Sequence, residues 1–221
     1  MKLGILFSGG KDSTFAAYLA KKHGHELACL ISLNSKNPDS YMFHTPSISC
    51  VEIQARAMNI PIVVKYTAGE KELELDDLED AIKDAIEQHE IEGIVTGAVE
   101  SVYQATRIQK ICNKLNIECF NPLWQKEQVE LLNDLISNKF KVILTGVFAY
   151  PLDEAWLGKE IDEQFIKDVI KVRDEFKINP AGEGGEYETF VLDCPLYESE
   201  IIIVDKKISG EKNSFRMELS F

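Results

Sequence analysis

The stretch Ser8-Gly9-Gly10-Lys11-Asp12-Ser13 follows an apolar run at residues 2–7 and precedes residues 14–23, whose apolar side chains recur at helical spacing. An apolar run of this length bounded by turn residues is typical of a buried strand. The two adjacent glycines allow a tight turn that residues with a side chain tolerate poorly. The sequence therefore predicts a strand, a short glycine loop and a helix in direct succession.

The same alternation continues along the first two-thirds of the chain, where strand-like runs are separated by segments with the apolar spacing of helices. Strands that alternate with helices predict a mostly parallel sheet with helices on both faces, which is an α/β fold. We expect strands at residues 2–7, 26–33, 61–66, 93–96, 118–121 and 141–147, and helices at 14–23, 48–58, 75–89, 101–115, 125–137 and 162–176.

The pattern changes near Pro151. Beyond it come one helix, a loop rich in Gly and Glu at residues 181–189, and strand-like runs at 190–192, 200–207 and 215–219. The last two runs are joined by residues 208–214, in which Gly210 and Asn213 are turn formers. We therefore expect residues 1–150 to form the domain with the parallel sheet and residues 151–221 to form a smaller, β-rich α+β subdomain.

Residues with functional chemistry follow the predicted strands. The glycine loop comes after the first strand, Ser32-Leu33-Asn34-Ser35 after the second, Thr96-Gly97-Ala98 after the fourth and Asn121-Pro122-Leu123-Trp124 after the fifth. Ligands of open α/β sheets bind at the carboxyl ends of the strands, where the strand order reverses. We expect these loops to border one crevice.

Composition excludes several classes of protein. The net charge of −13 disfavours nucleic acid as a partner, because binding its phosphates requires clustered Lys and Arg. The apolar runs are too short to span a membrane, and the first residues lack the pattern of a signal peptide. The five cysteines contain no C-x-x-C pair, which suits reduced thiols. We expect a cytoplasmic protein without a membrane partner.

The glycine loop is not a Walker A motif, because Asp12 stands where Ser or Thr is required and Ile5 stands where the first Gly is required. The chain also lacks the G-x-G-x-x-G pattern of dinucleotide-binding proteins at this point. A kinase or GTPase of the ordinary type is therefore not indicated.

Phosphate binding remains the chemistry that this loop suits. Its glycines let the backbone approach a phosphate closely, and the next helix presents free N–H groups and the positive end of its dipole. Ser8 and Ser13 add hydroxyl donors, and Lys11 adds a cation. A simple turn in which Asp12 and Ser13 cap the helix is the alternative, which the rarity of the six-residue set disfavours.

The set S-G-G-K-D-S resembles the phosphate loop of the PP-loop ATP pyrophosphatase superfamily. This resemblance implies a HUP-like (adenine nucleotide alpha hydrolase-like), Rossmann-type sheet and cleavage of ATP between its α- and β-phosphates, with adenylation of the substrate. It also implies that ATP binds to Ser8, Gly9, Gly10, Lys11, Asp12, Ser13, Ser32 and Gly97.

Three further segments narrow the resemblance. They are Glu183-Gly184-Gly185-Glu186-Tyr187-Glu188-Thr189, Gly97-Ala98-Val99-Glu100-Ser101-Val102-Tyr103-Gln104 with Arg107, and Asn121-Pro122-Leu123-Trp124. Together they are similar to the archaeal diphthine–ammonia ligase family, over nearly the whole chain. The resemblance implies amidation of diphthine, a trimethylated histidine derivative on translation elongation factor 2, with ATP and ammonium giving diphthamide, AMP and pyrophosphate.

The chemistry implied by this resemblance assigns roles to charged residues. Charge that develops at the α-phosphate needs fixed donors, and Lys11 with the loop amides is suited to supply them. Glu183 or Glu186 could remove the proton that converts ammonium to ammonia. Mg²⁺ is expected from the use of ATP, and the sequence does not identify its ligands.

The quaternary ammonium group of diphthine would be bound by aromatic faces and carboxylates. Two simpler interpretations stay open: the Glu residues could only solvate a turn, and Arg107 could form a structural salt bridge. Gln104 and Arg107, three residues apart, could share one helix face and reach a carboxylate or phosphate. The residues expected to bind the substrate are Tyr103, Gln104, Arg107, Trp124, Glu183, Gly184, Gly185, Glu186, Tyr187 and Glu188.

Three other functions remain as alternatives. A tRNA-modifying enzyme of the same superfamily would adenylate a base, and such enzymes commonly use catalytic cysteines, for which Cys112 and Cys119 are the one close pair. A ligase acting on a small metabolite would share the loop. A non-catalytic ATP-binding module would leave the Gly/Glu segment without a role. The sequence leaves the oligomeric state open, with a homodimer as one alternative.

Overall fold

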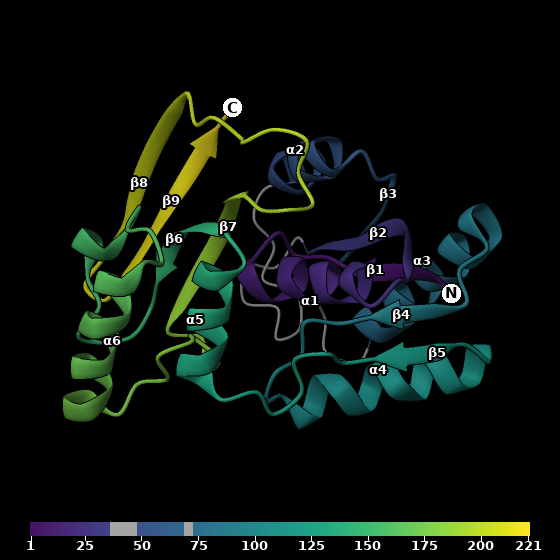
Figure 1. Ribbon diagram of the computed structural model, residues 1–221, viewed down its shortest axis with the longest axis horizontal. Coiled ribbons are helices and arrows are strands. Elements are labelled where there is room, and N and C mark those ends of the chain that lie inside the picture. The colour runs from purple at the N-terminus through teal and green to yellow at the C-terminus, as the bar shows by residue number, and fades with distance from the viewer. Residues whose placement is uncertain (36–47, 69–72) are drawn as a thin grey trace. The chain divides into compact units, whose positions relative to one another are not determined.

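The computed structural model describes residues 1–35, 48–68 and 73–221. The chain divides into two compact units, Met1–Trp124 and Gln125–Phe221, and each has its own sheet (Figure 1). In the described part of the chain, no helix is both long enough and apolar enough to cross a membrane.

The first unit contains a five-stranded parallel sheet, which confirms the predicted α/β fold. Its strands are β1 (Lys2–Leu6), β2 (Glu26–Ser35), β3 (Ile62–Thr67), β4 (Gly93–Val95) and β5 (Glu118–Phe120). They lie in the order β3-β2-β1-β4-β5, and each neighbouring pair is parallel. The order reverses between β1 and β4, so the loops that follow these two strands border the position where such sheets bind ligands.

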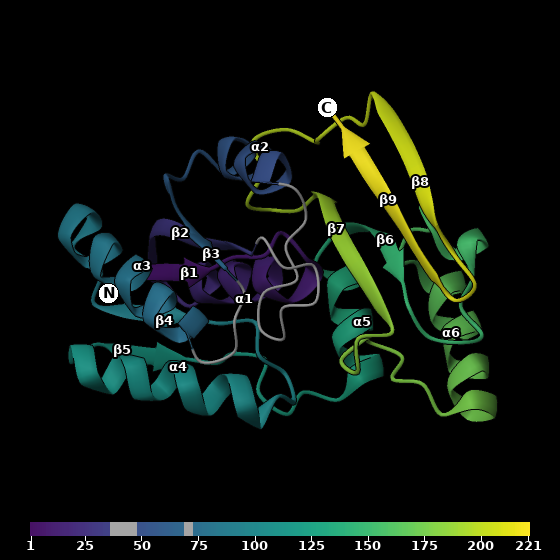
Figure 2. The same cartoon turned by 180° about the vertical axis from the view of Figure 1, so that it is seen from behind.

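The helices of the first unit cover both faces of this sheet. They are α1 (Lys11–Lys22), α2 (Ile48–Met58), α3 (Leu73–His89) and α4 (Val102–Leu115). Figures 1 and 2 show α1 on one face and α3 with α4 on the other. Leu78 and Ile82 of α3 share one buried cluster with Ile111 of α4 and Ile31 of β2. Cover on both faces explains why these strands read as continuous apolar runs.

The predicted sixth strand of the parallel sheet was assigned to the wrong sheet. Strand β6 (Lys141–Val147) pairs antiparallel with β7 (Tyr187–Asp193) and β9 (Ser214–Ser220) in the second unit. It is mostly buried between these neighbours, and a buried central strand of either kind of sheet gives the same apolar run. The compact units meet after Trp124, which differs from the boundary between residues 150 and 151 that we expected.

The second unit combines an antiparallel sheet with helices on one of its faces. Its sheet has the order β7-β6-β9-β8, where β8 is Asp205–Glu211. The helical elements are α5 (Gln128–Ser137), the 3₁₀ turn η1 (Glu154–Trp156) and α6 (Glu163–Phe176). Figures 1 and 2 show α5 and α6 on the same face of this sheet. The β-rich C-terminal region that we expected is therefore present, and its sheet also includes β6.

Two element boundaries in this unit differ from our expectation. Strand β8 begins at Asp205, five residues after the apolar run at 200–207 begins, and its turn with β9 is Lys212-Asn213. Ile201 is buried outside the strand, and its N–H donates to the Leu192 carbonyl at 2.9 Å. Ile201 therefore packs beside β7 instead of pairing in β8, whereas Ile202 is exposed. Strand β7 begins at Tyr187, within the segment that we expected to be a loop.

Candidate functional site

The glycine loop joins β1 to α1 at the carboxyl edge of the parallel sheet. Gly9 has φ of +79°, a left-handed conformation that favours glycine. Gly10 is the N-cap of α1 and has no side chain to cap the helix. The first N–H groups of α1 are therefore left without a side-chain cap from this position, which is the arrangement that suits an anion.

Ser8 and Ser13 connect the two ends of the loop. Their hydroxyl oxygens lie 3.1 Å apart, and the Ser8 N–H donates to Ser13 Oγ at 3.3 Å. Ser13 Oγ also donates to the Gly10 carbonyl at 3.2 Å. Ser13 is buried, whereas Ser8 is exposed. Ser13 therefore joins the two ends of the loop by hydrogen bonds. Ser8 lies at the surface, where a ligand could reach it.

Lys11 and Asp12 form an ion pair at the start of α1. Lys11 Nζ lies 2.7 Å from Asp12 Oδ2, and the Lys11 side chain is only 4% exposed. The buried Asp12 Oδ1 makes no hydrogen bond to any residue in the described part of the chain. This pair places a cation and an acceptor oxygen at one position, as a site for phosphate and a divalent cation requires.

Gly97 brings the loop after β4 against the start of α1. A Cβ atom at this position would lie 2.6 Å from the Ser13 nitrogen and 2.7 Å from the Asp12 carbonyl carbon, so only glycine fits. Thr96 supports the turn: its Oγ1 donates to Asn121 Oδ1 at 2.6 Å and accepts from the Ala98 N–H at 3.1 Å. The loops after β1, β4 and β5 are thus linked, as the sheet order implied.

Ser32 lies within β2 rather than after it, because this strand continues to Ser35. Ser32 is buried and has Val64 of β3 as its neighbour in the sheet. The last residue of β1, Leu6, is paired with Ile31. Ser32 therefore lies one residue beyond the end of β1, at the level where the glycine loop begins.

The sequence did not identify Gln54 of α2, which contacts this loop. Its side chain is fully buried, and its Nε2 donates to the Gly9 carbonyl at 2.9 Å. Cys50, Val51, Ala55 and Met58 form the buried side of the same helix. The sequence did contain a signal, because Gln54 lies within an apolar stripe of the predicted helix. A buried amide requires a hydrogen-bonding partner, so this position predicts a polar contact.

The expected substrate residues of α4 are partly brought together. The Arg107 guanidinium lies over the Tyr103 ring, 3.4 Å from the ring centre, as a stacked cation–π pair. Gln104, which we expected to share a face with Arg107, lies in the first turn, where its N–H donates to the N-cap Ser101 Oγ at 3.3 Å. Tyr103 and Arg107 thus form a pair, and one face of the Tyr103 ring is already covered.

Trp124 lies on a different side of α4. It is 36% exposed and borders a hollow of about 340 Å³ that Ala105, Thr106, Gln109, Lys110 and Asn121 also line. Tyr103, Gln104 and Arg107 are not among the residues that line it. Trp124 is therefore not placed with the other expected substrate residues of this unit.

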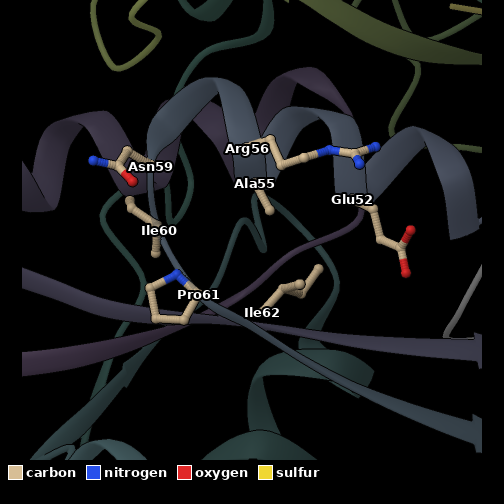
Figure 3. A pocket seen from close by; sticks show the side chains of 7 residues that line it. All are labelled: Glu52, Ala55, Arg56, Asn59, Ile60, Pro61 and Ile62. Atoms are coloured by element: carbon tan, nitrogen blue, oxygen red, sulfur yellow. The ribbon is translucent and has the colours of Figure 1, made fainter.

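A second hollow, of about 530 Å³, lies between α2 and the start of β3 (Figure 3). In the close-up, Arg56 and Glu52 extend from α2, while Pro61 and Ile62 lie below the helix. Pro61 and Ile62 stand at the amino end of β3, whereas the glycine loop follows the carboxyl end of β1. This hollow is thus separate from the glycine loop.

The Gly/Glu segment of the second unit forms a loop around the Glu186 carboxylate. Oε1 accepts the Asn179 N–H and Oε2 accepts the Gly184 N–H, both at 2.8 Å. A Cβ atom at Gly184 would lie 2.7 Å from Oε1, so a larger residue there would displace the carboxylate. Gly185 has φ of +82°, and its N–H donates to the Gly182 carbonyl at 3.1 Å. Glu186 therefore organises this loop through both of its oxygens.

The neighbours of Glu186 have different surroundings. Tyr187 is buried, and its hydroxyl donates to the Pro180 carbonyl at 2.7 Å. Glu188 faces Arg216 across β6, with 3.7 Å between carboxylate and guanidinium. Glu183 is half-buried in the loop itself. Their expected roles stay predictions.

The thiols divide into packing residues and one more acidic group. Burial raises the pKa of Cys29 and of Cys194 to about 12. A hydrogen bond with Cys119, together with burial, raises the pKa of Cys112. The pKa of Cys119 is lowered, because Cys112 and then the Asn121 amide, 3.9 Å away, hydrogen-bond to its sulfur. Of these four thiols, Cys119 is the one that ionises most readily.

The fold and the loop define an α/β protein with a glycine loop and an uncapped helix start at the carboxyl edge of a parallel sheet. Comparison with known families is more specific. The diphthamide synthase N-terminal domain matches residues 1–119, and the diphthamide synthase C-terminal domain matches residues 127–217. The chain therefore belongs to the diphthamide synthase family.

Curated relatives support this assignment. Proteins of Bos taurus and Homo sapiens named diphthine–ammonia ligase are each 34% identical over 228 residues, which cover 94% of this chain and 85% of the relative. A Schizosaccharomyces pombe protein of the same name is 35% identical over 232 residues, which cover 96% of this chain and only 38% of the relative. The family is thus one of ligases that form C–N bonds, and its Schizosaccharomyces pombe member is much longer than the region shared with this chain.

A solved structure described as a predicted subunit of tRNA methyltransferase from Methanocaldococcus jannaschii aligns with 91% of this chain at 22% identity. Its TM-score of 0.46 is too low to support a conclusion about function.

Proposed function

We propose that this protein amidates diphthine on translation elongation factor 2 with ammonium, at the expense of ATP. The observation that carries the proposal is that both family domains match, one over each compact unit. The relatives named diphthine–ammonia ligase support the reaction. The glycine loop supports the use of ATP, because it combines a left-handed glycine, an uncapped helix start and a buried lysine.

In this proposal the glycine loop binds the phosphates of ATP. Lys11 and the loop amides stabilise the charge that develops when a carboxylate oxygen attacks the α-phosphorus and pyrophosphate leaves. Gly97 keeps the neighbouring loop close to the start of α1. Ser8 is the exposed hydroxyl of the loop, and Ser32 lies at the same level of the sheet. The product of this step is an acyl-adenylate, and the final nucleotide is AMP.

Mg²⁺ fits this site through Asp12. Among the described residues, no group of three His, Cys, Asp or Glu side chains could hold a metal ion on its own. Mg²⁺ bound with ATP needs only one or two carboxylates, since phosphates and water supply its other ligands. Asp12 offers the buried oxygen Oδ1, and the ion would supply additional charge neutralisation at the phosphates.

The second step is amide formation. The nitrogen of neutral ammonia attacks the acyl carbon, AMP leaves with the bonding electrons, and one proton must be removed from nitrogen. We assign proton removal to Glu183 rather than to Glu186, since both Glu186 oxygens accept main-chain hydrogen bonds. Glu186, Gly184 and Gly185 hold the loop in shape for the substrate.

Binding of the trimethylammonium group remains assigned to aromatic and acidic side chains. The candidate contacts are the Tyr103 ring and the exposed part of Trp124, at separate positions in the first unit, and the Glu183 carboxylate in the second unit. Gln104 and Arg107 lie on the same helix as Tyr103 and would orient the substrate carboxylate. Tyr187 and Glu188 support the loop and strand that carry Glu183.

The test is incubation of diphthine-bearing elongation factor 2 with the protein, ATP and ammonium. Mass spectrometry of the modified histidine should show the small mass loss that accompanies replacement of a carboxyl OH by an amide NH₂, with AMP and pyrophosphate formed in equal amounts. ADP as the product would refute the adenylation step. Pyrophosphate release driven by tRNA or by a small carboxylic acid, without elongation factor 2, would refute the substrate.

A further inference from the structure

We propose that Gln54 is a positioning residue for the phosphate loop: by holding the Gly9 carbonyl toward the core, it turns the Gly10 N–H toward the phosphates of ATP. This inference rests on the proposed use of ATP. It adds a residue of α2, outside the loop sequence, to the residues proposed to bind the nucleotide.

The contact between Gln54 and Gly9 is close and buried. Gln54 Nε2 donates to the Gly9 carbonyl at 2.9 Å, and the Gln54 side chain has no exposed surface. A Cβ atom at Gly9 would lie 2.3 Å from Gln54 Oε1. The glutamine therefore fills the space that a side chain at position 9 would need, and residues 9 and 54 fit each other as a pair.

The direction of the Gly10 N–H follows from peptide geometry. The Gly9–Gly10 peptide is trans, because the cis bond recorded in the described part of the chain is Tyr150-Pro151. In a trans peptide the C=O and N–H bonds point in opposite directions. When Gln54 holds the Gly9 oxygen inward, the Gly10 N–H must point outward, toward exposed Ser8.

The Gly10 N–H makes a weak hydrogen bond within the described part of the chain and can bind a stronger acceptor. Its contact is Ser8 Oγ at 3.4 Å, which is longer than an ordinary N–H···O hydrogen bond. A phosphate oxygen carries negative charge and would form a shorter, stronger bond with the same donor. Without the Gln54 amide, the Gly9–Gly10 peptide could rotate, since both glycines have wide conformational freedom.

The burial of Gln54 also indicates a specific role. The side chain lies in the apolar stripe of α2 beside Val51, Ala55 and Met58, where leucine or methionine would pack without cost to polar groups. The hydrogen bond to Gly9 gives the amide its function at this position. An apolar replacement of similar size should therefore preserve the fold and remove the hydrogen bond to the Gly9 carbonyl.

The experiment compares ligand binding by Gln54→Leu, Gln54→Met and wild type, using isothermal titration calorimetry with ATP, inorganic pyrophosphate and adenosine. Loss of one oriented donor should raise Kd for ATP and for pyrophosphate roughly five- to tenfold. Kd for adenosine, which has no phosphate, should change by less than about twofold. Glu52→Gln, an exposed change on the same helix, should leave all three values unaltered.

Thermal unfolding of each variant reports whether it is folded, and two apolar variants are used so that one poorly packed side chain does not decide the result. Unchanged ATP binding by a folded Gln54 variant would overturn the inference, and so would an equal loss for ATP and adenosine. These outcomes leave the proposed function intact. Absence of ATP binding by the wild-type chain would instead overturn the proposed function, and this inference with it.

Discussion

At the scale of single residues, the glutamates of the Gly/Glu loop have different surroundings although the sequence presents them alike. Glu186 accepts two main-chain hydrogen bonds, Glu188 faces Arg216, and Glu183 lies in the loop itself. Residue type and spacing alone could not separate these roles. The separation depends on which main-chain groups the loop turns toward each carboxylate.

This difference gives a prediction for Glu186→Gln. The amide has one acceptor oxygen, so one of the Asn179 and Gly184 N–H groups would face an NH₂ group instead. We expect the free energy of unfolding to fall by about 1–2 kcal/mol, because a hydrogen bond to a charged acceptor is lost at a partly exposed site. Urea unfolding measures this change.

The exposed Glu198→Gln serves as the control and should leave stability unchanged. Glu186→Gln with wild-type stability but impaired turnover would contradict the structural role and would favour direct contact with the substrate.

At the scale of elements, the helices differ in whether a side chain caps their first turn. Helix α1 begins with Gly10, which leaves its first N–H groups for a ligand, whereas α4, α5 and α6 begin with Ser101, Glu127 and Asp162, whose side chains cap them. In each capped helix, the cap side chain accepts one of the first N–H groups. This contrast marks α1 as the helix whose start is suited to bind an anion.

The cap of α6 provides a test of this reasoning. Asp162 Oδ1 accepts the Phe165 N–H at 2.7 Å and lies at the positive end of the helix dipole. Asp162→Ala should lower the free energy of unfolding by about 1 kcal/mol, as measured by urea unfolding.

The matched control for this cap is Glu175→Ala, which removes an exposed acid from the opposite end of the same helix, where a negative charge is not favoured. We expect no loss of stability from it. Equal stability of the two variants would show that the Asp162 cap does not contribute.

At the scale of the whole molecule, the chain consists of two units that each complete a sheet and a core. The division after Trp124 keeps β6 with β7 and β9, its partners on either side. A division after residue 150 would remove the central strand from the antiparallel sheet. The position of β6 therefore decides which fragments can fold.

We predict that fragments 1–124 and 125–221 each fold, with cooperative thermal unfolding followed by circular dichroism. Fragments 1–150 and 151–221 should aggregate or remain unfolded, because the mostly buried β6 would lose both neighbours. The second pair of fragments is the control for the first. Cooperative unfolding of 151–221 alone would contradict the assignment of β6 to the second unit.

The sequence by itself determined the glycine loop, the parallel α/β sheet around it and the family resemblance, because each depends on residues close together in the chain or on local apolar spacing. Helix limits were predicted to within a few residues for the same reason. Gly97 was also correctly expected after the fourth strand, whereas Ser32, which we expected after the second strand, lies within it.

The tertiary structure decided the features that depend on contacts between distant residues. It placed β6 in the antiparallel sheet, brought Gln54 to Gly9 across 45 positions of sequence and surrounded the Glu186 carboxylate with main-chain donors. Apolar spacing specifies that a segment is buried but not which neighbour buries it. A hydrogen bond between residues far apart leaves no local pattern, and therefore only the folded chain shows it.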